Sequence, residues 1–250
     1  MANDIYIKYL PAVDSTNSYL RYGREALSAE AGDARFIVVY AGEQSAGRGQ
    51  RGNVWHSGKG ENLLLSLLVR PRFLPVRNQF LLSQAIALAV NATMHAYGIE
   101  SAIKWPNDIY VGNRKVAGIL VELDCEGEAV ECAVVGVGVN VNQTAFPAME
   151  KIPVSLSLLT GRCHDVKEVL DLLLSSFVHY YGMLENGEAA KVVEEYRCNL
   201  MGYGVTMRYR DAVSVFDAVV KDVLGDGALC LEKVGGGLSQ FYFKEVELLL

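Results

Sequence analysis

The sequence predicts an α+β fold in two parts, a large region that mixes strands and helices and a small all-β region after it. At 250 residues the chain is long enough for one large and one small domain. Up to about residue 200, short apolar runs alternate with segments of helical periodicity. From Met201 onward, short strand-like segments are separated by Gly- and Asp-rich turns, which is typical of a small β-barrel or sandwich. We therefore expect domains at 1–200 and 201–250.

Strands of the large region are predicted from short apolar runs bounded by turn residues. The run at 62–69 has leucine on both faces, which is typical of a strand buried on both sides. Asn113 suits a tight hairpin turn between two of the runs. We expect strands at Ile5–Leu10, Phe36–Ala41, Asn62–Val69, Ile103–Trp105, Ile109–Val111, Lys115–Leu123 and Ala129–Val141, with a turn at Asp124–Glu128.

Helices are predicted where apolar residues recur every three to four positions. Capping residues at 14–17, followed by Tyr19, Leu20 and Leu27, indicate one helix of about three turns. The other helices are expected at Asn78–Tyr97, Ser155–Leu159, Asp165–Leu184 and Glu188–Leu200. In the small region, the expected strands are Val205–Tyr209, Val213–Leu224, Ala228–Val234, Leu238–Phe243 and Val246–Leu249.

Composition and charge limit the classes of protein that this chain can be. The net charge of −6 argues against a general nucleic-acid binder. No apolar run reaches the roughly 18 residues of a membrane span, and the N-terminus does not resemble a signal or transit peptide. The five cysteines are scattered and form no C-x-x-C pair, which indicates reduced thiols and a cytoplasmic location. No Ser-His-Asp set, zinc spacing, Walker A loop or Gly-x-Gly-x-x-Gly fingerprint occurs.

The segment 42–55 is the first candidate for a ligand-binding element. Glycine lets a backbone approach a ligand closely, and successive N–H groups in such turns form anion sites. Arginine adds a fork of donors for phosphate or carboxylate. A solvated surface run of charge is the alternative. The segment lies between two predicted strands and carries Gly47, Arg48, Gly49, Arg51 and Gly52.

Other polar stretches stand where their neighbours are apolar. Ser15, Thr16 and Asn17 could hold an uncharged polar group such as a ureido ring, or could simply cap a helix. Gly136 and Gly138 leave one strand face bare, so either another element or a flat ligand packs there. Further candidates are Lys104 and Lys115 as cations, Asp108 as a metal anchor, and Trp55 and Trp105 as flat walls.

These groups suit a reaction between two anions, such as a carboxylate that attacks the α-phosphate of ATP. Two unit charges about 4 Å apart repel by about 4 kcal/mol at an effective dielectric constant near 20. Cations around the reacting atoms, together with Mg2+, would offset this repulsion. Lys115 is the candidate that bridges carboxylate and phosphate, because Gly118 leaves room beside it; a solvated hairpin lysine is the alternative.

Four blocks of sequence resemble, in order, the signature blocks of biotin protein ligases. They are GRGQRGNVW at 47–55, KWPND at 104–108, RKVAGILVE at 114–122 and GVGVNVN at 136–142, preceded by DSTN at 14–17. The resemblance spans most of residues 5–145, and the small C-terminal β region also matches. It implies a mixed-sheet catalytic domain with flanking helices, like that of class II aminoacyl-tRNA synthetases, followed by an SH3-like barrel.

The resemblance implies an ATP-dependent enzyme with two half-reactions. Biotin and MgATP give biotinyl-5′-AMP and pyrophosphate, and a lysine of a biotin carboxyl carrier protein then attacks the acyl-adenylate. Lys115 and Arg48 are the implied catalytic residues. The implied biotin-binding residues are Ser15, Thr16, Asn17, Gln44, Gly47, Arg48, Gly49, Gln50, Lys115 and Gly118. The implied adenylate-binding residues are Arg48, Arg51, Trp55, Lys104, Asn107, Lys115 and Asn140, with Asp108 as the Mg2+ ligand.

The chain departs from the family pattern in two respects. Many relatives carry a basic residue where this chain has Gln50, so the loop is less positive. The first catalytic strand is expected near Ile5, which leaves no room for the helix-turn-helix domain of relatives that repress transcription, and no DNA binding is expected. A lipoate or octanoate ligase of the same superfamily is one alternative, and a nucleic-acid-binding module is another. The sequence is compatible with either a monomer or a homodimer.

Overall fold

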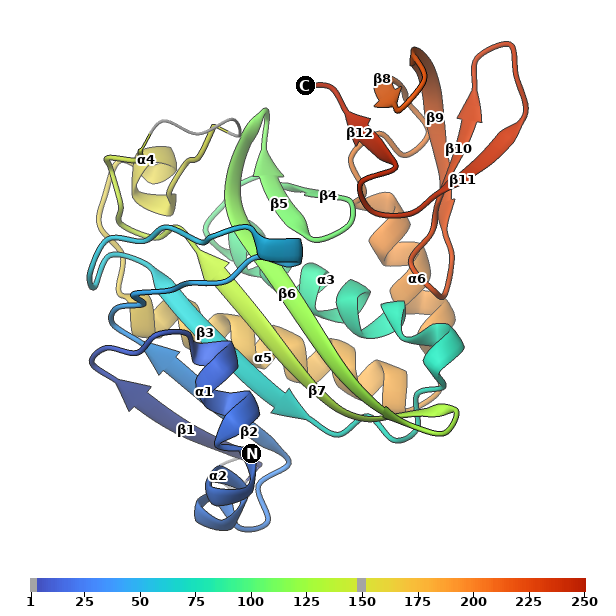
Figure 1. Ribbon diagram of the computed structural model, residues 1–250. Coiled ribbons are helices and arrows are strands. Elements are labelled where there is room, and N and C mark those ends of the chain that lie inside the picture. Colours follow the sequence, from blue (N-terminus) through green and yellow to red (C-terminus); the bar gives the residue numbers. More distant parts are fainter. Residues whose placement is uncertain (1–3, 148–151) are drawn as a thin grey trace.

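A seven-stranded sheet forms the centre of the computed structural model, which describes residues 4–147 and 152–250. The strand order is β1-β2-β3-β7-β6-β5-β4 (Figure 1). β1 is parallel to β2 and the remaining neighbours are antiparallel, so the sheet is mixed, as the resemblance implies. The strands are β1 (Ile5–Leu10), β2 (Phe36–Ala41), β3 (Leu63–Val69), β4 (Ala102–Lys104), β5 (Asp108–Val111), β6 (Arg114–Glu126) and β7 (Ala129–Val139).

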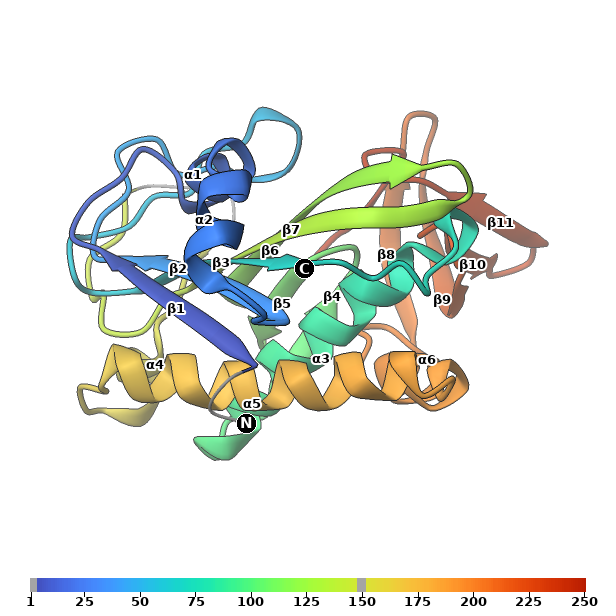
Figure 2. The ribbon, with the colours of Figure 1, turned by 90° about the horizontal axis from the view of Figure 1, so that it is seen from below.

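Helices cover both faces of this sheet (Figure 2). Side chains alternate along β2, so Phe36 and Val38 pack under α3 and α5, whereas Ile37 and Val39 pack under α1 and α2. No helix in the described part of the chain is long and apolar enough to span a bilayer. The helices are α1 (Thr16–Tyr22), α2 (Arg24–Ala31), α3 (Phe80–Ala96), α4 (Leu156–Thr160), α5 (Val166–Glu185) and α6 (Ala189–Cys198), with 3-10 turns η1 (Gln50–Gly52) and η2 (Val76–Asn78).

The prediction of a single N-terminal helix is wrong, because Gly23 divides it into α1 and α2. The N–H of Gly23 donates to the carbonyl oxygen of Tyr19 at 2.9 Å. A Cβ at residue 23 would lie 2.8 Å from that same oxygen, so this close turn requires glycine. The change of direction brings both Leu20 and Leu27 into the smaller core.

The turn predicted at 124–128 is also shorter than expected. β6 extends to Glu126, because Asp124 pairs with Cys132 and Cys125 pairs with Val130 across a bulge. Only residues 127 and 128 remain for the turn, where Gly127 has a φ of 58°. The long β6–β7 hairpin therefore places the blocks 114–122 and 136–142 on adjacent strands.

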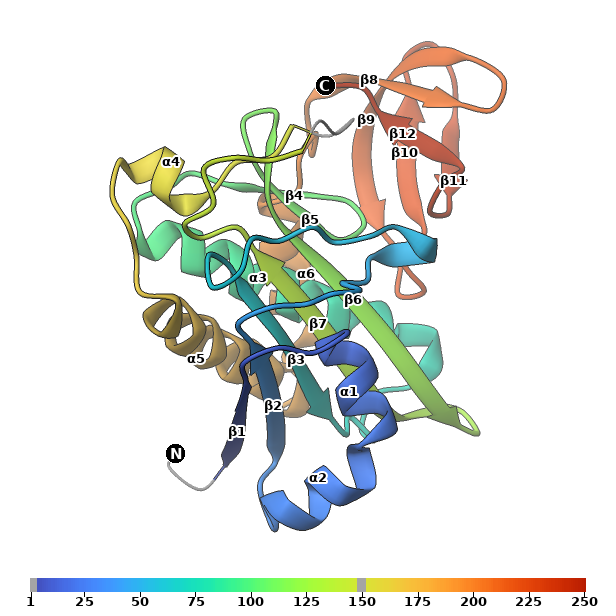
Figure 3. The same ribbon diagram turned by 60° about the vertical axis from the view of Figure 1, so that its left-hand side comes forward.

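A second, antiparallel sheet follows α6, with the order β11-β10-β9-β8-β12. It lies beside β4 and β5, away from α1 and α2 (Figure 3). Met201 N donates to Ile103 O at 2.9 Å, and Phe80 N donates to Gly225 O at 3.0 Å, so backbone bonds attach it to the main sheet region. A domain boundary near residue 200 stays a prediction. The strands are β8 (Thr206–Asp211), β9 (Val215–Val223), β10 (Leu229–Lys233), β11 (Leu238–Phe241) and β12 (Val246–Leu248).

We expect Phe177→Ala to destabilise the fold by about 3–5 kcal/mol, because it leaves a cavity between α5 and the sheet. Phe177 is fully buried, and its ring centroid lies 5.9 Å from that of Phe36 on β2. Urea unfolding followed by circular dichroism measures the loss. Ser175→Ala, at an exposed position of the same helix, is the control and should change stability by less than about 0.5 kcal/mol. An equally small effect of Phe177→Ala would contradict this packing.

Candidate functional site

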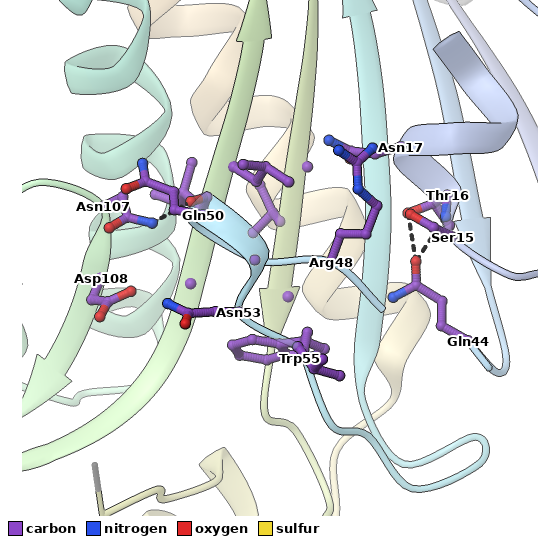
Figure 4. A pocket seen from close by; sticks show the side chains of 18 of the residues that line it. Ser15, Thr16, Asn17, Gln44, Arg48, Gln50, Asn53, Trp55, Asn107 and Asp108 are labelled. Atoms are coloured by element: carbon purple, nitrogen blue, oxygen red, sulfur yellow. Dashed lines mark hydrogen bonds between the residues drawn. The ribbon is translucent and has the colours of Figure 1, made fainter. Parts of the chain in front are cut away.

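The sequence blocks meet around one cavity on the face of the sheet that carries α1. The cavity has a volume of about 80 Å³. Its walls come from the N-terminus of α1, the loop between β2 and β3, and strands β5, β6 and β7 (Figure 4). The predicted site residues that line it are Ser15, Thr16, Asn17, Gln44, Arg48, Gly49, Gln50, Trp55, Asn107, Asp108, Lys115 and Gly118.

Glycines on β6 and β7 form a flat floor on which the ring of Trp55 lies. Gly118 is paired directly with Gly138. A Cβ at residue 118 would lie 2.9 Å from the Trp55 ring, and one at residue 138 would lie 2.4 Å from it. The strand face that the sequence leaves bare is thus covered by another element of the chain. The indole Nε1 of Trp55 is buried there without a hydrogen-bond partner among the described residues.

A network of uncharged polar groups forms the wall beside α1. Ser15 is the N-cap of α1, and its side chain accepts from Ser18 N. Gln44 Oε1 accepts from Thr16 N at 2.7 Å and from Thr16 Oγ1 at 3.1 Å (Figure 4). Asn17 lies against the other bare glycine, since a Cβ on Gly136 would meet its Oδ1 at 2.1 Å. These contacts fix donors and acceptors at one end of the cavity.

Ser66, which is not among the residues predicted from the sequence, supports this wall from β3. It lies fully buried on β3, where its Oγ bonds to Thr16 Oγ1 at 2.8 Å and also to Asn17 Oδ1. A buried hydroxyl without a partner is unfavourable, so this pairing orients both side chains of α1. The available signal was one serine inside an otherwise apolar run, Leu63–Val69.

Two cations of the cavity are each paired with a carboxylate. Lys115 Nζ lies 2.6 Å from Asp108 Oδ1 and 5.4 Å from the centre of the Trp55 ring. Arg48 donates to Glu122 through NH2 at 2.9 Å and through NH1 at 3.3 Å. The Asp108 residue is only 4% exposed, and a carboxylate at that depth requires a cationic or hydrogen-bonding partner.

The loop 47–55 is closed by bonds between its own two ends. Trp55 N donates to Gly47 O at 3.0 Å, and Gly49 N donates to Asn53 O at 2.7 Å. A Cβ at residue 47 would lie 2.5 Å from Trp55 O, so glycine is required at this close approach. Arg51 belongs to η1, but its side chain lies outside the described part of the structure.

Asn140 and Lys104 are predicted site residues that lie away from the cavity, and Gly47, at the base of the loop, does not line it either. Asn140 is buried and donates to Val154 O at 3.1 Å and Lys115 O at 3.4 Å, so it supports the strand that carries Lys115. Lys104 Nζ donates to Leu248 O at 3.4 Å and lies 5.0 Å from the Tyr110 ring. Burial, with a contribution from Asp108, raises the pKa of Tyr110 above its ordinary value.

Lys104 lines a second cavity, of about 470 Å³, between the main sheet and the C-terminal sheet. This cavity shares Asn107, Asp108 and Phe243 with the first. Phe243, between β11 and β12, is thus a residue of the C-terminal part that reaches the first cavity. No local pattern around Phe243 indicates this contact.

A model of the biotin/lipoate A/B protein ligase family matches residues 9–140, more than half of the 250-residue chain. The chain belongs to this family. It is 33% identical over 216 residues to the bifunctional ligase/repressor BirA of Bacillus subtilis. The matched region covers 84% of this chain and 66% of that protein, which is just under two thirds of its length. It is 31% identical over 237 residues to the biotin–[acetyl-CoA-carboxylase] ligase of Paracoccus denitrificans, covering 91% of this chain and 94% of that protein.

The fold also matches solved structures of biotin protein ligases. The enzyme of Aquifex aeolicus in complex with biotin and ATP superposes with a TM-score of 0.79 at 24% identity, over 98% of both chains. That likeness confirms the predicted fold class, including the β region that follows the mixed sheet.

We expect Gly138→Ala to displace the ring of Trp55, because the new methyl group would overlap the indole. In a Trp105→Phe background Trp55 is the one tryptophan, since the chain contains two. In this background, Gly138→Ala should raise the efficiency with which acrylamide quenches the fluorescence of Trp55 by about twofold or more, as expected for an indole that leaves a packed position. Gly182→Ala, where the added Cβ meets nothing within 4 Å, is the matched control and should leave quenching unchanged. Identical quenching of the two variants would refute the contact.

Proposed function

We propose that this protein is an ATP-dependent biotin protein ligase. It activates biotin as biotinyl-5′-AMP and transfers the biotinyl group to a lysine of a biotin carboxyl carrier protein in the cytoplasm. The observation that carries the proposal is the meeting of four signature blocks around one cavity with an uncharged polar wall and two cations. The biotin ligase names of the relatives that match this chain along most of its length support the choice of biotin.

The uncharged wall is suited to the ureido ring of biotin. A ureido group presents two N–H donors and one carbonyl acceptor and carries no charge. Ser15, Thr16 and Gln44 offer hydroxyl and amide groups that can reciprocate these bonds without a charged partner. Asn17 and the hydroxyl of Ser66 hold the wall in place. Binding energy from the ring would thus position the carboxylate at the far end of the molecule.

In the first half-reaction, a carboxylate oxygen of biotin attacks the α-phosphorus of ATP. A C–O–P linkage forms, the bond from the α-phosphorus to the bridging oxygen breaks, and pyrophosphate leaves with that oxygen. Lys115 provides the positive charge that lowers the repulsion between the two anions and stabilises the charge on the transferring phosphoryl group. To do so it shares or exchanges its present partner, Asp108.

In the second half-reaction, the neutral amine of the carrier lysine attacks the acyl carbon of biotinyl-5′-AMP. An amide bond forms, the acyl–oxygen bond breaks, AMP leaves with that oxygen, and the proton lost by the amine passes to water. Lys115 again faces the phosphate, which is now part of the leaving group, and Arg48 adds a second positive charge there.

Mg2+ enters this proposal with ATP. No group of three or more metal-ligating side chains occurs among the described residues. Mg2+ is commonly held by substrate phosphates and water together with one carboxylate of the protein, and this arrangement needs no such group. Asp108 fits that part, because it lines the cavity and already faces a cation at 2.6 Å. The ion would screen the phosphate charges during attack.

Loading of the site requires movement of Trp55. The cavity of about 80 Å³ is far smaller than the ~300 Å³ or more that small-molecule sites typically offer. Trp55 lies on the glycine floor, and turning its ring aside would open that floor to a flat ligand. Its unpartnered Nε1 would then be free to find a hydrogen-bond acceptor. Gln50 lines the same cavity as an uncharged residue and would leave the phosphate less strongly held.

We expect Lys115→Ala to lower the rate of biotin-dependent pyrophosphate release by about 10²- to 10³-fold, as the loss of one preorganised cation does in other enzymes. Release of pyrophosphate from ATP and biotin, measured with a coupled phosphate assay, tests this. Lys8→Ala, at an ion-paired lysine on β1, is the control and should retain the full rate. Near wild-type release by a folded Lys115→Ala protein would rule out this role for Lys115.

Biotin should stabilise the protein against thermal unfolding, and lipoate should not. A ligand at 100 times its Kd stabilises the native state by about 2.7 kcal/mol, which raises Tm by several degrees. Calorimetry with both compounds measures the two affinities directly. Tighter binding of lipoate would favour a lipoate or octanoate ligase. Salt-dependent binding of nucleic acid without any binding of biotin would favour a nucleic-acid-binding module.

A further inference from the structure

Glu122 on β6 is a charged residue that the proposed reaction does not use. Its side chain is 15% exposed and accepts hydrogen bonds from two separate elements. From α1 it receives Asn17 Nδ2 at 2.9 Å and Arg21 NH1 at 3.3 Å. From the loop it receives both terminal nitrogens of Arg48, at 2.9 and 3.3 Å. Glu122 therefore joins the biotin-side wall to the loop.

The contact with Arg48 has the two-point geometry that makes arginine–carboxylate pairs specific. One terminal nitrogen faces each carboxylate oxygen. Solvent screens it only in part, because Arg48 is 44% exposed whereas Glu122 is 15% exposed. Exposed single-point pairs contribute little to stability, and a two-point pair on a mostly buried carboxylate contributes more.

The contact of Arg48 with Glu122 also restrains the two ends of the 47–55 loop, because Arg48 is bonded to them through its backbone. Arg48 forms a backbone bridge with Val54, and the next residue, Trp55, bonds back to Gly47. The ring of Trp55 can turn without breaking these backbone contacts, whereas lifting the whole loop must separate Arg48 from Glu122. The two movements therefore have different consequences: ring rotation admits a ligand, and separation of the pair opens the cavity.

We propose that Glu122 is a positioning residue that keeps the 47–55 loop closed over biotinyl-5′-AMP through Arg48. The proposal rests on the proposed function. It assigns to Arg48 a second task besides facing the phosphate, since its guanidinium also fastens the loop to β6. The competing possibility is that Glu122 only withdraws Arg48 from the ligand. That possibility makes the opposite prediction, because removal of Glu122 would then strengthen retention of the intermediate.

The test is the rate at which preformed biotinyl-5′-AMP leaves the enzyme. The adenylate is made from radiolabelled biotin and ATP with pyrophosphatase present, and its release is followed after excess unlabelled biotin is added. We expect Glu122→Gln to release it about tenfold faster than the wild type, because a neutral amide forms a weaker pair with arginine. The rate of adenylate formation should change much less than the rate of release.

A double-mutant cycle distinguishes the loss of the Arg48–Glu122 contact from independent effects of the two substitutions. If the pair acts as a unit, Arg48→Ala combined with Glu122→Gln releases the adenylate no faster than the faster single variant. Glu131→Gln is the matched control, since Glu131 on β7 forms a two-point pair with Arg72 outside the cavity. It should release the intermediate at the wild-type rate.

Several outcomes would overturn the proposal: unchanged release from Glu122→Gln, slower release, or effects that multiply in the double variant. If Glu122→Gln does not fold, Arg48→Lys tests the same contact from the loop side, because lysine keeps the charge and loses the two-point geometry. Release of the adenylate at the wild-type rate by Arg48→Lys would then refute the proposed role of Glu122. Failure of the proposed function is a distinct result, in which the wild type forms no biotinyl-5′-AMP.

Discussion

The site depends on the direct pairing of Gly118 on β6 with Gly138 on β7. Two facing residues without side chains leave a strip of bare backbone, and a Cβ at either position would overlap the ring of Trp55. The same strip sets the position of Lys115, whose Cε would lie 3.2 Å from a Cβ at residue 118. The loop, the cation and the floor of the cavity are therefore fixed by one register of one hairpin. A shift of that register by one residue would turn the glycines to the opposite face of the sheet.

Charge in this cavity is balanced locally and owes little to the net charge of the protein. Lys115 is matched by Asp108, and Arg48 is matched by Glu122. Taking a charge out of water without a partner is very unfavourable, so the carboxylates that accompany these cations stabilise them in the cavity. Under the proposed function, an anionic substrate would bind to the two cations by sharing or replacing those carboxylates. The acidic composition of the chain is compatible with an anion site for this reason.

Local patterns predicted the positions of most strands, and the family resemblance supplied most of the residues that line the cavity. The strand at Phe36–Ala41 agrees at both ends, because its run of apolar residues is bounded by turn residues on each side. The sequence did not identify Glu122, whose partner Asn17 is 105 positions away, since contacts at that separation leave no local periodicity. The family resemblance also implied a contact between Asn140 and the adenylate, from the position of this residue in the GVGVNVN block. In the structure that side chain bonds to backbone carbonyl groups inside the protein.

The KWPND block has a second task that its position in the sequence does not indicate. Trp105 Nε1 donates to Gly227 O at 3.0 Å and Lys104 Nζ donates to Leu248 O at 3.4 Å, so the start of the block holds the C-terminal sheet. Its end, Asn107 and Asp108, lines the cavity. The block thus couples the position of the C-terminal sheet to the site, and Phe243 reaches the cavity from that sheet at the same edge. The C-terminal sheet therefore contributes to the wall of the site, because the two cavities share these residues.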